Sequence, residues 1–373
     1  MDQNTIVLHL SLINDFGPVS IAKLVDYCIR HTIALDNIYA FTINDFKLVG
    51  FSAEKSQFLV NELKQHQVLD KELALLEKSR LHYTTIVDKT YPSLLAKIYA
   101  PPAVLYYQGD GNAMINQCAL AVVGSRACNS YGGQVITQLL PACIAQGITI
   151  VSGGALGIDT LAHQITVDHG GKTVVVLGSG LLRQYPSTNR RLFEKVVEKG
   201  GSIVSCFSLE MEAFPGNFPA RNRIIAGLAQ TTLVVQAAEK SGALITASYA
   251  LEQGRNVAAV PGNIFDPLSV GCNNLIKQGA YLVENPIDIL QLYDITINKN
   301  QLQNPDLLVE TKSADMRLTD EQKQIIAFCK NNERTVDEIM AHVQLSSEKV
   351  SQELFNLECL GVIQNNFLHW KSV

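Results

Sequence analysis

The stretch "AVVGSRACNSYGGQVITQLL", from Ala121 to Leu140, decides the fold of this chain. An apolar, strand-like run that begins at Ala119 stops at Gly124-Ser125-Arg126, and turn-forming residues then lead into a helix-like stretch. A strand, a tight turn and a helix in this order are typical of the first unit of a nucleotide-binding α/β fold, although the G-x-G-x-x-G spacing is missing. An arginine stands where the backbone of such a turn would approach a phosphate. We therefore expect this turn to bind phosphate through a guanidinium group.

The same alternation of apolar runs and helix-like stretches continues to about residue 295. The runs are apolar along their whole length, as in a parallel sheet that is covered on both faces. We predict a doubly wound, mainly parallel, Rossmann-like sheet over residues 81–295, with ligands at the carboxyl ends of the strands. The expected strands are 103–107, 120–123, 149–152, 173–177, 202–206, 232–235 and 257–260, and the helices between them include 133–146, 189–199 and 244–253.

Three other segments flank this core. Residues 1–80 indicate short helices around Gly17-Pro18 and Gly50, which either present backbone amides to phosphates or form a small packing domain. Residues 296–315 are polar and aperiodic, which favours a linker. Residues 316–373 show three helical patterns followed by a strand, a turn at Asn365-Asn366 and a short strand, which predicts a winged helix.

Composition narrows the class of protein. The chain is 47% hydrophobic and 17% charged, and no apolar run approaches the ~18–20 residues of a membrane span. No signal peptide is evident, and the eight cysteines are scattered without metal-ligand spacing, so we expect reduced thiols in a cytoplasmic protein. Residues 81–295 carry 14 Lys and Arg against 14 Asp and Glu. Six arginines of this segment lie in predicted loops, where they can form a focused positive patch: Arg126, Arg183, Arg190, Arg191, Arg221 and Arg223.

The loops at the strand ends combine arginine, aromatic and glycine residues. Gly153 and Gly154 would let backbone N–H groups approach a ligand. Phe214 and Phe218 lie in a Pro/Gly-rich stretch that is expected to be irregular. Cations follow phosphates and aromatic rings stack on bases, so this combination favours a site for single-stranded nucleic acid. The loop at 177–192 contributes Ser179, Gly180, Arg183, Tyr185, Arg190 and Arg191.

Other chemistries are less well supported. Asp159 and His163 are four residues apart, which fits a general acid/base pair, a weak metal pair, or a capping Asp beside a hydrogen-bonded His. Arg126 could instead pair with Asp159, and Phe218 could instead anchor its loop in the core. A P-loop is absent, and no acidic residue follows the first turn at the distance that NAD binding requires. We therefore expect no cofactor.

Seven motifs in order resemble the DprA/Smf family: "VVGSR", "SGGALGIDTLAH", "GGKTVVVLGSG", "YPSTNRRL", "NFPARNRIIAGLA", "KSGALITASYALEQGR" and "VPGN". The resemblance covers about residues 91–284. It implies a bacterial cytoplasmic protein of natural transformation that binds incoming single-stranded DNA, forms a homodimer through the core and helps to load the RecA recombinase. It also implies that residues 1–80 resemble a sterile alpha motif domain.

The strand-end loops and the family motifs together give the candidate residues; the motifs themselves match Arg126, Lys172, Phe218, Arg221, Arg223 and Lys240. The predicted DNA-binding set is Gly124, Ser125, Arg126, Gly153, Gly154, Lys172, Arg183, Arg190, Arg191, Phe218, Arg221, Arg223 and Lys240. The family's dimer and RecA-contact region matches Leu275, Ile276, Tyr281 and Val283, which could alternatively only close the sheet. The chain departs from the family at Leu156, where a cation is frequent, and it lacks the basic residues that often stand before NFP and after Y-P. Arg183, Arg190 and Arg191 are expected to compensate.

Two further expectations concern activity. The core also resembles nucleotide phosphoribohydrolases, but the glutamate motif of those enzymes is missing, and Glu252 falls well into a helix. A non-catalytic protein is therefore favoured, with the hydrolase as the alternative. Residues 316–373 carry 6 Lys and Arg against 8 Asp and Glu, and the predicted recognition helix has Glu348, Glu353 and Glu358 against Lys349. Like charges repel phosphates, so we predict a protein-interaction surface that does not bind duplex DNA.

Overall fold

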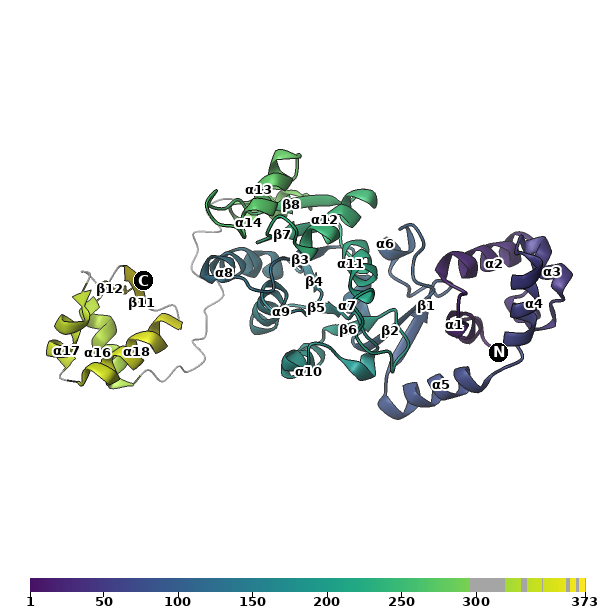
Figure 1. Cartoon of the computed structure of the whole chain (residues 1–373), viewed down its shortest axis with the longest axis horizontal. Coiled ribbons are helices and arrows are strands. Elements are labelled where there is room, and N and C mark those ends of the chain that lie inside the picture. The colour runs from purple at the N-terminus through teal and green to yellow at the C-terminus, as the bar shows by residue number, and fades with distance from the viewer. Residues whose placement is uncertain (296–318, 330–333, 344, 360–362, 367–368, 373) are drawn as a thin grey trace. The chain divides into compact units, whose positions relative to one another are not determined.

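A computed structural model describes residues 1–295, 319–329, 334–343, 345–359, 363–366 and 369–372 (Figure 1). The chain divides into two compact units, Met1–Val309 and Glu310–Val373. The predicted linker at 296–315 lies outside the described residues. Within the described part of the chain, no helix is long and apolar enough to cross a membrane.

The first unit contains a nine-stranded sheet in the order β1-β2-β6-β5-β4-β3-β7-β8-β9. From β6 to β9 in this order, each strand pairs in parallel with the next. At one edge of the sheet, β2 pairs antiparallel with both β6 and β1. The mainly parallel, Rossmann-like sheet is confirmed, and six predicted strands match within one residue at each end. The strands are β1 His82–Thr85, β2 Val104–Gly109, β3 Ala119–Val123, β4 Thr149–Ser152, β5 Thr173–Val176, β6 Ser202–Ser205, β7 Thr231–Val234, β8 Asn256–Ala259 and β9 Tyr281–Leu282.

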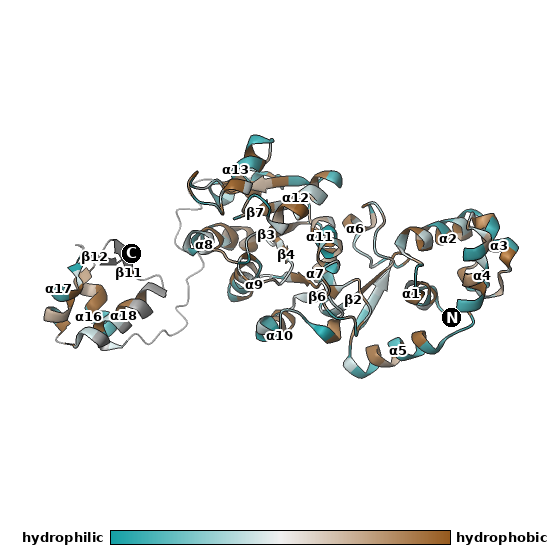
Figure 2. Cartoon of the chain, in the orientation of Figure 1, coloured by the Kyte–Doolittle hydropathy of each residue, from teal (hydrophilic) through white to brown (hydrophobic). Residues whose placement is uncertain are grey.

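Helices cover both faces of the sheet, which explains why its strands are apolar on both sides. One face packs against α8 Ser130–Ala145, α9 Ile158–Asp168, α10 Arg190–Glu198 and α14 Pro286–Gln291. The other packs against α6 Ser93–Ala96, α7 Asn112–Ile115, α11 Asn217–Gly227, α12 Gly242–Glu252 and α13 Val270–Lys277. In Figure 2 these helices carry both apolar and polar residues, as expected when one side of a helix is buried.

The N-terminal segment forms the short helices that the sequence predicts. They are α1 Gln3–Leu12, α2 Pro18–Arg30, η1 Leu35–Ala40, α3 Ile43–Val49, α4 Ala53–Glu62 and α5 Gln67–Ser79. Ser52 caps α4 by accepting a hydrogen bond from Lys55 N, and Pro18 occupies the first turn of α2, where its missing N–H costs nothing. Their apolar side chains join those of β2, β5, β6 and α10 in one buried cluster.

A polar contact also ties these helices to the sheet. The Glu72 side chain of α5 is 6% exposed and accepts a hydrogen bond from the Leu209 N–H at 2.8 Å. Burial, followed by the charge of Glu72, raises the pKa of Tyr106 well above its usual value. Lys71 pairs with Glu210 at 2.6 Å on the adjacent surface. The loop after β6 is therefore held by α5 as well as by its own strand.

The second unit contains the three helices and two final strands that the sequence predicts, and also a short strand, β10, that it does not; the winged-helix assignment itself stays a prediction. Its elements are α16 Asp320–Cys329, β10 Arg334–Thr335, α17 Val336–Val343, α18 Ser347–Cys359, β11 Ile363–Asn366 and β12 His369–Ser372. The strands form a sheet in the order β10-β12-β11. Asn365 and Asn366, which we expected in a turn, instead end β11 and pair with β12.

One of the three glutamates in the predicted recognition helix, which is α18, is not exposed to a ligand. Glu353 is buried, accepts a hydrogen bond from Gln322 Nε2 at 2.7 Å and lies 3.2 Å from Lys349 Nζ. Its carboxylate faces the bundle and cannot repel a phosphate from outside. The side chains of Glu348 and Glu358 lie outside the described part of the structure.

Candidate nucleic-acid interface

A hollow of about 410 Å³ lies where the strand order of the sheet reverses, between β3 and β7. Parallel sheets bind their ligands at this position, because the loops after the two strands diverge there. The wall comes from the loops after β3, β4 and β7 and from the first turns of α11 and α12. We call it the first hollow. Its lining includes Gly124, Ser125, Arg126, Asp159, Phe218, Arg221, Ser241 and Gly242.

The Gly124-Ser125-Arg126 turn is fixed by its neighbours. A side chain at Gly124 would meet Ile158 Cγ1 at 2.6 Å, so only glycine fits. Ser125 N donates to Gln236 O at 2.7 Å, which binds the turn to the loop after β7. Arg126 is exposed, and within the described residues no carboxylate pairs with it, so the expected alternative of an ion pair with Asp159 is not observed. Its guanidinium is left to line the hollow.

Phe218 contacts both arginines of the hollow. The guanidinium carbons of Arg126 and Arg221 lie 5.3 and 5.8 Å from the centre of its ring, within the range of a cation–π interaction. Contrary to our expectation of irregular structure, Phe218 is in the first turn of α11. Pro219 is tolerated there because the N–H groups of a first helical turn have no partner within the helix.

Arg221 is an internal support. It is 4% exposed and donates to the backbone carbonyls of Gly153 and Val176, which lie at the carboxyl ends of β4 and β5. Burial lowers its pKa to about 10, so it is charged at neutral pH. A side chain at Gly153 would overlap the guanidinium, at 2.7 Å from Cζ. Arg221 therefore joins two strand ends below the hollow rather than extending from the surface.

The loop after β4 turns its polar groups inward. Asp159 accepts hydrogen bonds from the N–H groups of Gly153 and Ala155 at 3.1 and 3.3 Å. The N–H of Gly153 is therefore occupied, and Gly154 is buried against Phe193, so neither glycine offers the approach that we predicted. Burial raises the pKa of Asp159, and the charge of Arg221 opposes this shift.

His163 is fully buried, with Nδ1 2.7 Å from Thr173 Oγ1, and burial lowers its pKa from 6.5 to about 3. Of the alternatives for Asp159 and His163, the capping Asp and the hydrogen-bonded His match the geometry. A neutral, enclosed His has no path to a substrate, and Glu252 is exposed at the end of α12.

A second hollow of about 370 Å³ contains two more predicted residues, Arg183 and Arg190. Arg183 lies in a short turn after β5, and Arg190 begins α10 and pairs with Glu194 at 3.4 Å. Both are exposed, and so is Arg191, which lines neither hollow.

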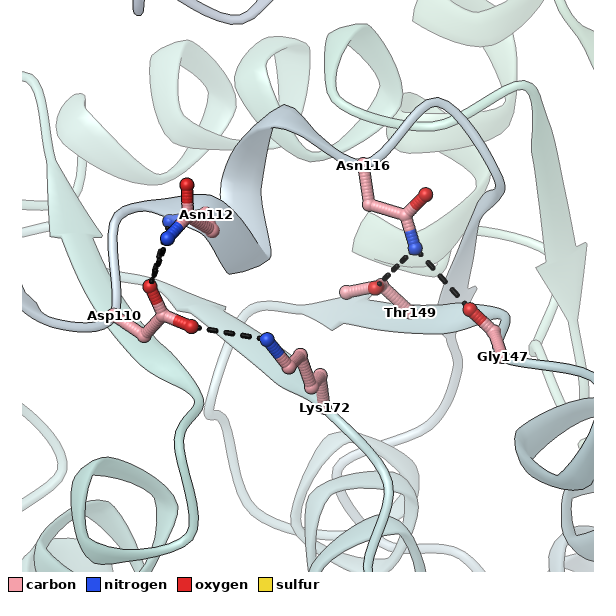
Figure 3. A network of polar contacts seen from close by, with 6 residues as sticks. All are labelled: Asp110, Asn112, Asn116, Gly147, Thr149 and Lys172. Atoms are coloured by element: carbon pink, nitrogen blue, oxygen red, sulfur yellow. Dashed lines mark hydrogen bonds and ion pairs between the residues drawn. The ribbon is translucent and has the colours of Figure 1, made fainter.

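Lys172 belongs to a polar network with Asp110, away from the first hollow, and Figure 3 shows this network. Lys172 directly precedes β5, whereas Arg126 directly follows β3, and parallel strands put those positions at opposite edges. There Lys172 pairs with Asp110 at 3.0 Å and lowers the pKa of that carboxyl group, while Asn116 bonds Thr149 nearby. The structure therefore does not bring Lys172 to the candidate interface.

The two remaining predicted cations, Arg223 and Lys240, lie in different positions relative to the first hollow. Arg223 turns away from the first hollow and donates to the carbonyls of Tyr99 and Ala100. Lys240 is exposed in the loop before α12, next to Ser241, which lines the first hollow.

The four predicted dimer residues differ in how far they are buried. Val283 is completely buried in one cluster of the core, and Leu275 and Ile276 are half-buried against the cluster on the other face, so these three help to close the sheet. Tyr281 is 52% exposed on β9, the last strand of the sheet. Leu282, the next residue of β9, is also exposed, and it lines one shallow, mainly apolar surface together with Ile264 and Ile276.

Sequence reasoning named Tyr185 only as one residue of the arginine-rich loop at 177–192 and did not include it in the predicted DNA-binding set. Its ring is 50% exposed and lies 6.1 Å from that of Phe218, centre to centre. An aromatic between glutamine and proline in an arginine-rich loop is the signal that could have identified it.

Comparisons with known proteins find relatives of the core in both sequence and fold. Residues 82–294 match the family model of DNA recombination-mediator protein A. DNA processing protein DprA of Streptococcus pneumoniae is 40% identical over 210 residues, which are 56% of this chain and 73% of the relative. The X-ray structure of DNA processing protein A from Streptococcus pneumoniae aligns with a TM-score of 0.69 at 31% identity, over 80% of this chain and 100% of that one.

A second solved structure, from Helicobacter pylori, concerns the single-stranded DNA binding mode of DNA processing protein A. It aligns with a TM-score of 0.52 at 27% identity, over 58% of this chain and 98% of that one.

Proposed function

The chain belongs to the DNA recombination-mediator protein A family, and we propose that it binds single-stranded DNA along the carboxyl edge of its sheet without catalysing a reaction on it. The observation that carries this proposal is the first hollow, where an exposed arginine and an aromatic ring lie side by side at the strand-order reversal. The Helicobacter pylori relative, whose structure was solved for its single-stranded DNA binding mode, supports the choice of ligand.

In this proposal Arg126 binds a phosphate and Phe218 stacks on a base. A guanidinium can fork onto two phosphate oxygens, and among the described residues no carboxylate competes for Arg126. Phe218 holds this guanidinium in place through its ring and presents the remaining ring surface to the hollow. Arg183 and Arg190 supply positive charge further along the edge, where the chain lacks the family's basic residues near NFP and Y-P.

The partners in this proposal are a second copy of the chain and RecA. The exposed apolar residues at β9 support a homodimer, because a free strand edge with apolar neighbours favours association. The family description, a recombination mediator, supports delivery of the bound strand to a recombinase. The biological setting that follows from the resemblance is natural transformation in the bacterial cytoplasm.

The test compares binding of single-stranded and duplex oligonucleotides of one length by fluorescence anisotropy over a range of salt. We expect preference for the single strand, little sequence dependence and a steep loss of affinity with salt, because phosphate neutralisation releases counterions. Equal affinity for duplex at moderate salt contradicts the proposal. Release of free base from nucleoside monophosphates would instead support the hydrolase alternative.

A further inference from the structure

The segment that carries Tyr185 is next to both hollows. Phe218 lines the first hollow, and the Tyr185 ring lies 6.1 Å from the Phe218 ring. Gln184 and Ser187, the neighbours of Tyr185 and Pro186 in sequence, line the second hollow. Tyr185 is therefore on the ridge between the Arg126 side and the Arg183 side of the carboxyl edge.

The Tyr185 ring is more open than the Phe218 ring. Phe218 has two guanidinium groups at its ring, and its Cδ1 lies 3.0 Å from where a side-chain carbon at Gly178 would be. Tyr185 is 50% exposed, and within the described residues no hydrogen bond engages its hydroxyl. An aromatic ring with an open face next to cations is the form of a base-stacking platform.

The backbone on both sides of Tyr185 is anchored. Leu182 N donates to Leu209 O at 3.0 Å, and Gln184 Nε2 donates to Gln108 Oε1 at 3.3 Å. On the other side, the buried Asn189 donates to Gly154 O at 2.9 Å and lies 2.8 Å from Thr160 Oγ1. A ring on an anchored loop loses little conformational freedom when a ligand binds it.

We propose that Tyr185 is a second base-stacking platform, over which a single strand passes from the first hollow, with Arg126, to the second hollow, with Arg183 and Arg190. This inference rests on the proposed function, because it takes the ligand to be single-stranded DNA. A strand held in this way has one base against Phe218, another against Tyr185 and phosphates at the arginines on both sides. Stacking accepts any base, so the ridge adds affinity without sequence preference.

The experiment measures the affinity of the full chain for a single-stranded thymidine oligonucleotide. Tyr185→Leu keeps apolar bulk but removes the flat ring, and we expect binding at least about fivefold weaker. Tyr185→Phe keeps the ring and should retain most of the affinity. Tyr99→Leu is the matched control, because Tyr99 is 84% exposed and lines neither hollow, and it should bind as the unchanged chain does.

Two further measurements separate stacking from a change in structure. An oligonucleotide that lacks bases should bind the Tyr185→Leu variant and the unchanged chain equally, because the stacking contribution has been removed from both. In a Tyr185→Trp variant, DNA should quench the new fluorescence. The natural background is the single Trp370, which is 8% exposed in the other unit.

The results distinguish this inference from the function it rests on. If Tyr185→Leu binds with full affinity, or if Tyr185→Trp is not quenched, while Arg126→Ala binds weakly, the ridge is not a platform and the proposed function stands. If the unchanged chain shows no preference for single strands, both are overturned.

Discussion

Arg126→Ala and Lys172→Ala each remove one positive charge, from opposite edges of the same sheet. Arg126 is exposed and unpaired among the described residues, so its main contact in the folded chain is the Phe218 ring at 5.3 Å. An exposed cation–π contact contributes ~0.5–1 kcal/mol, which is at most a few degrees of melting temperature in a chain of this size. The exposed pair of Lys172 with Asp110 contributes ~0–1 kcal/mol, so both variants should fold normally.

Their effects on DNA binding should differ. A hydrogen bond to a charged group contributes about 1.5–3 kcal/mol, so loss of the Arg126–phosphate contact should weaken single-strand binding roughly 10- to 150-fold. The slope of log affinity against log salt should also become shallower by about 0.7, the contribution of one phosphate on a single strand. Lys172→Ala should leave both quantities nearly unchanged.

Fluorescence anisotropy with a labelled single strand at several salt concentrations measures both quantities, and thermal unfolding checks the fold. Arg126→Lys adds a useful comparison, because it keeps the salt slope and loses the forked geometry. A large fall in melting temperature with intact binding would make Arg126 a structural residue. If Lys172→Ala weakens binding as strongly as Arg126→Ala, the carboxyl edge is not the interface.

The remaining predictions concern other parts of the chain. Phe218→Leu should weaken single-strand binding, since it removes the stacking face and the support of Arg126; unaltered affinity in a titration would exclude stacking. Because burial lowers the pKa of His163 from 6.5 to about 3, the unfolded chain binds a proton that the folded chain excludes. Stability should therefore fall as the pH drops below 6.5, by up to roughly 1.4 kcal/mol per pH unit, and urea unfolding of His163→Gln should show a flatter pH dependence. Light scattering should detect a dimer at tens of micromolar, a concentration of roughly the order suited to weak homodimers, and Leu282→Lys should shift it toward the monomer. The isolated segment 316–373 should not shift duplex DNA at physiological salt, and a chain ending at residue 300 should still bind single strands; either opposite result rejects the proposed protein-interaction role.

The sheet could be predicted because its strands are short apolar runs with turn residues after them, and that pattern depends only on local sequence. The edge strand β1, with the polar sequence His82–Thr85, carries no such pattern and was not predicted. The position of Arg126 followed from its place after a strand. Lys172 comes before its strand, so the same rule places it at the opposite end of the strands. The family motif that Lys172 matches does not indicate this position.

The role of Arg221 could not be predicted. Its acceptors, Gly153 and Val176, are 68 and 45 residues away in the sequence, and only the folded sheet brings those carbonyls together. An arginine in a loop looks the same in the sequence whether it faces solvent or supports two strand ends. The contact of Tyr185 with Phe218 is a second case, because Phe218 comes from α11 and only the folded chain brings the two rings within 6.1 Å of each other.

The Glu72 contact determines how the chain can be shortened. A recombinant fragment that begins at His82, where the family match starts, would lose the carboxylate that accepts the Leu209 N–H and would uncover the apolar side chains of β2 and α10 that the N-terminal helices bury. We expect such a fragment to be less stable than the full chain, for reasons unrelated to DNA. A recombinant fragment of the core should therefore include the helices of residues 1–80, whatever part those helices play in the cell.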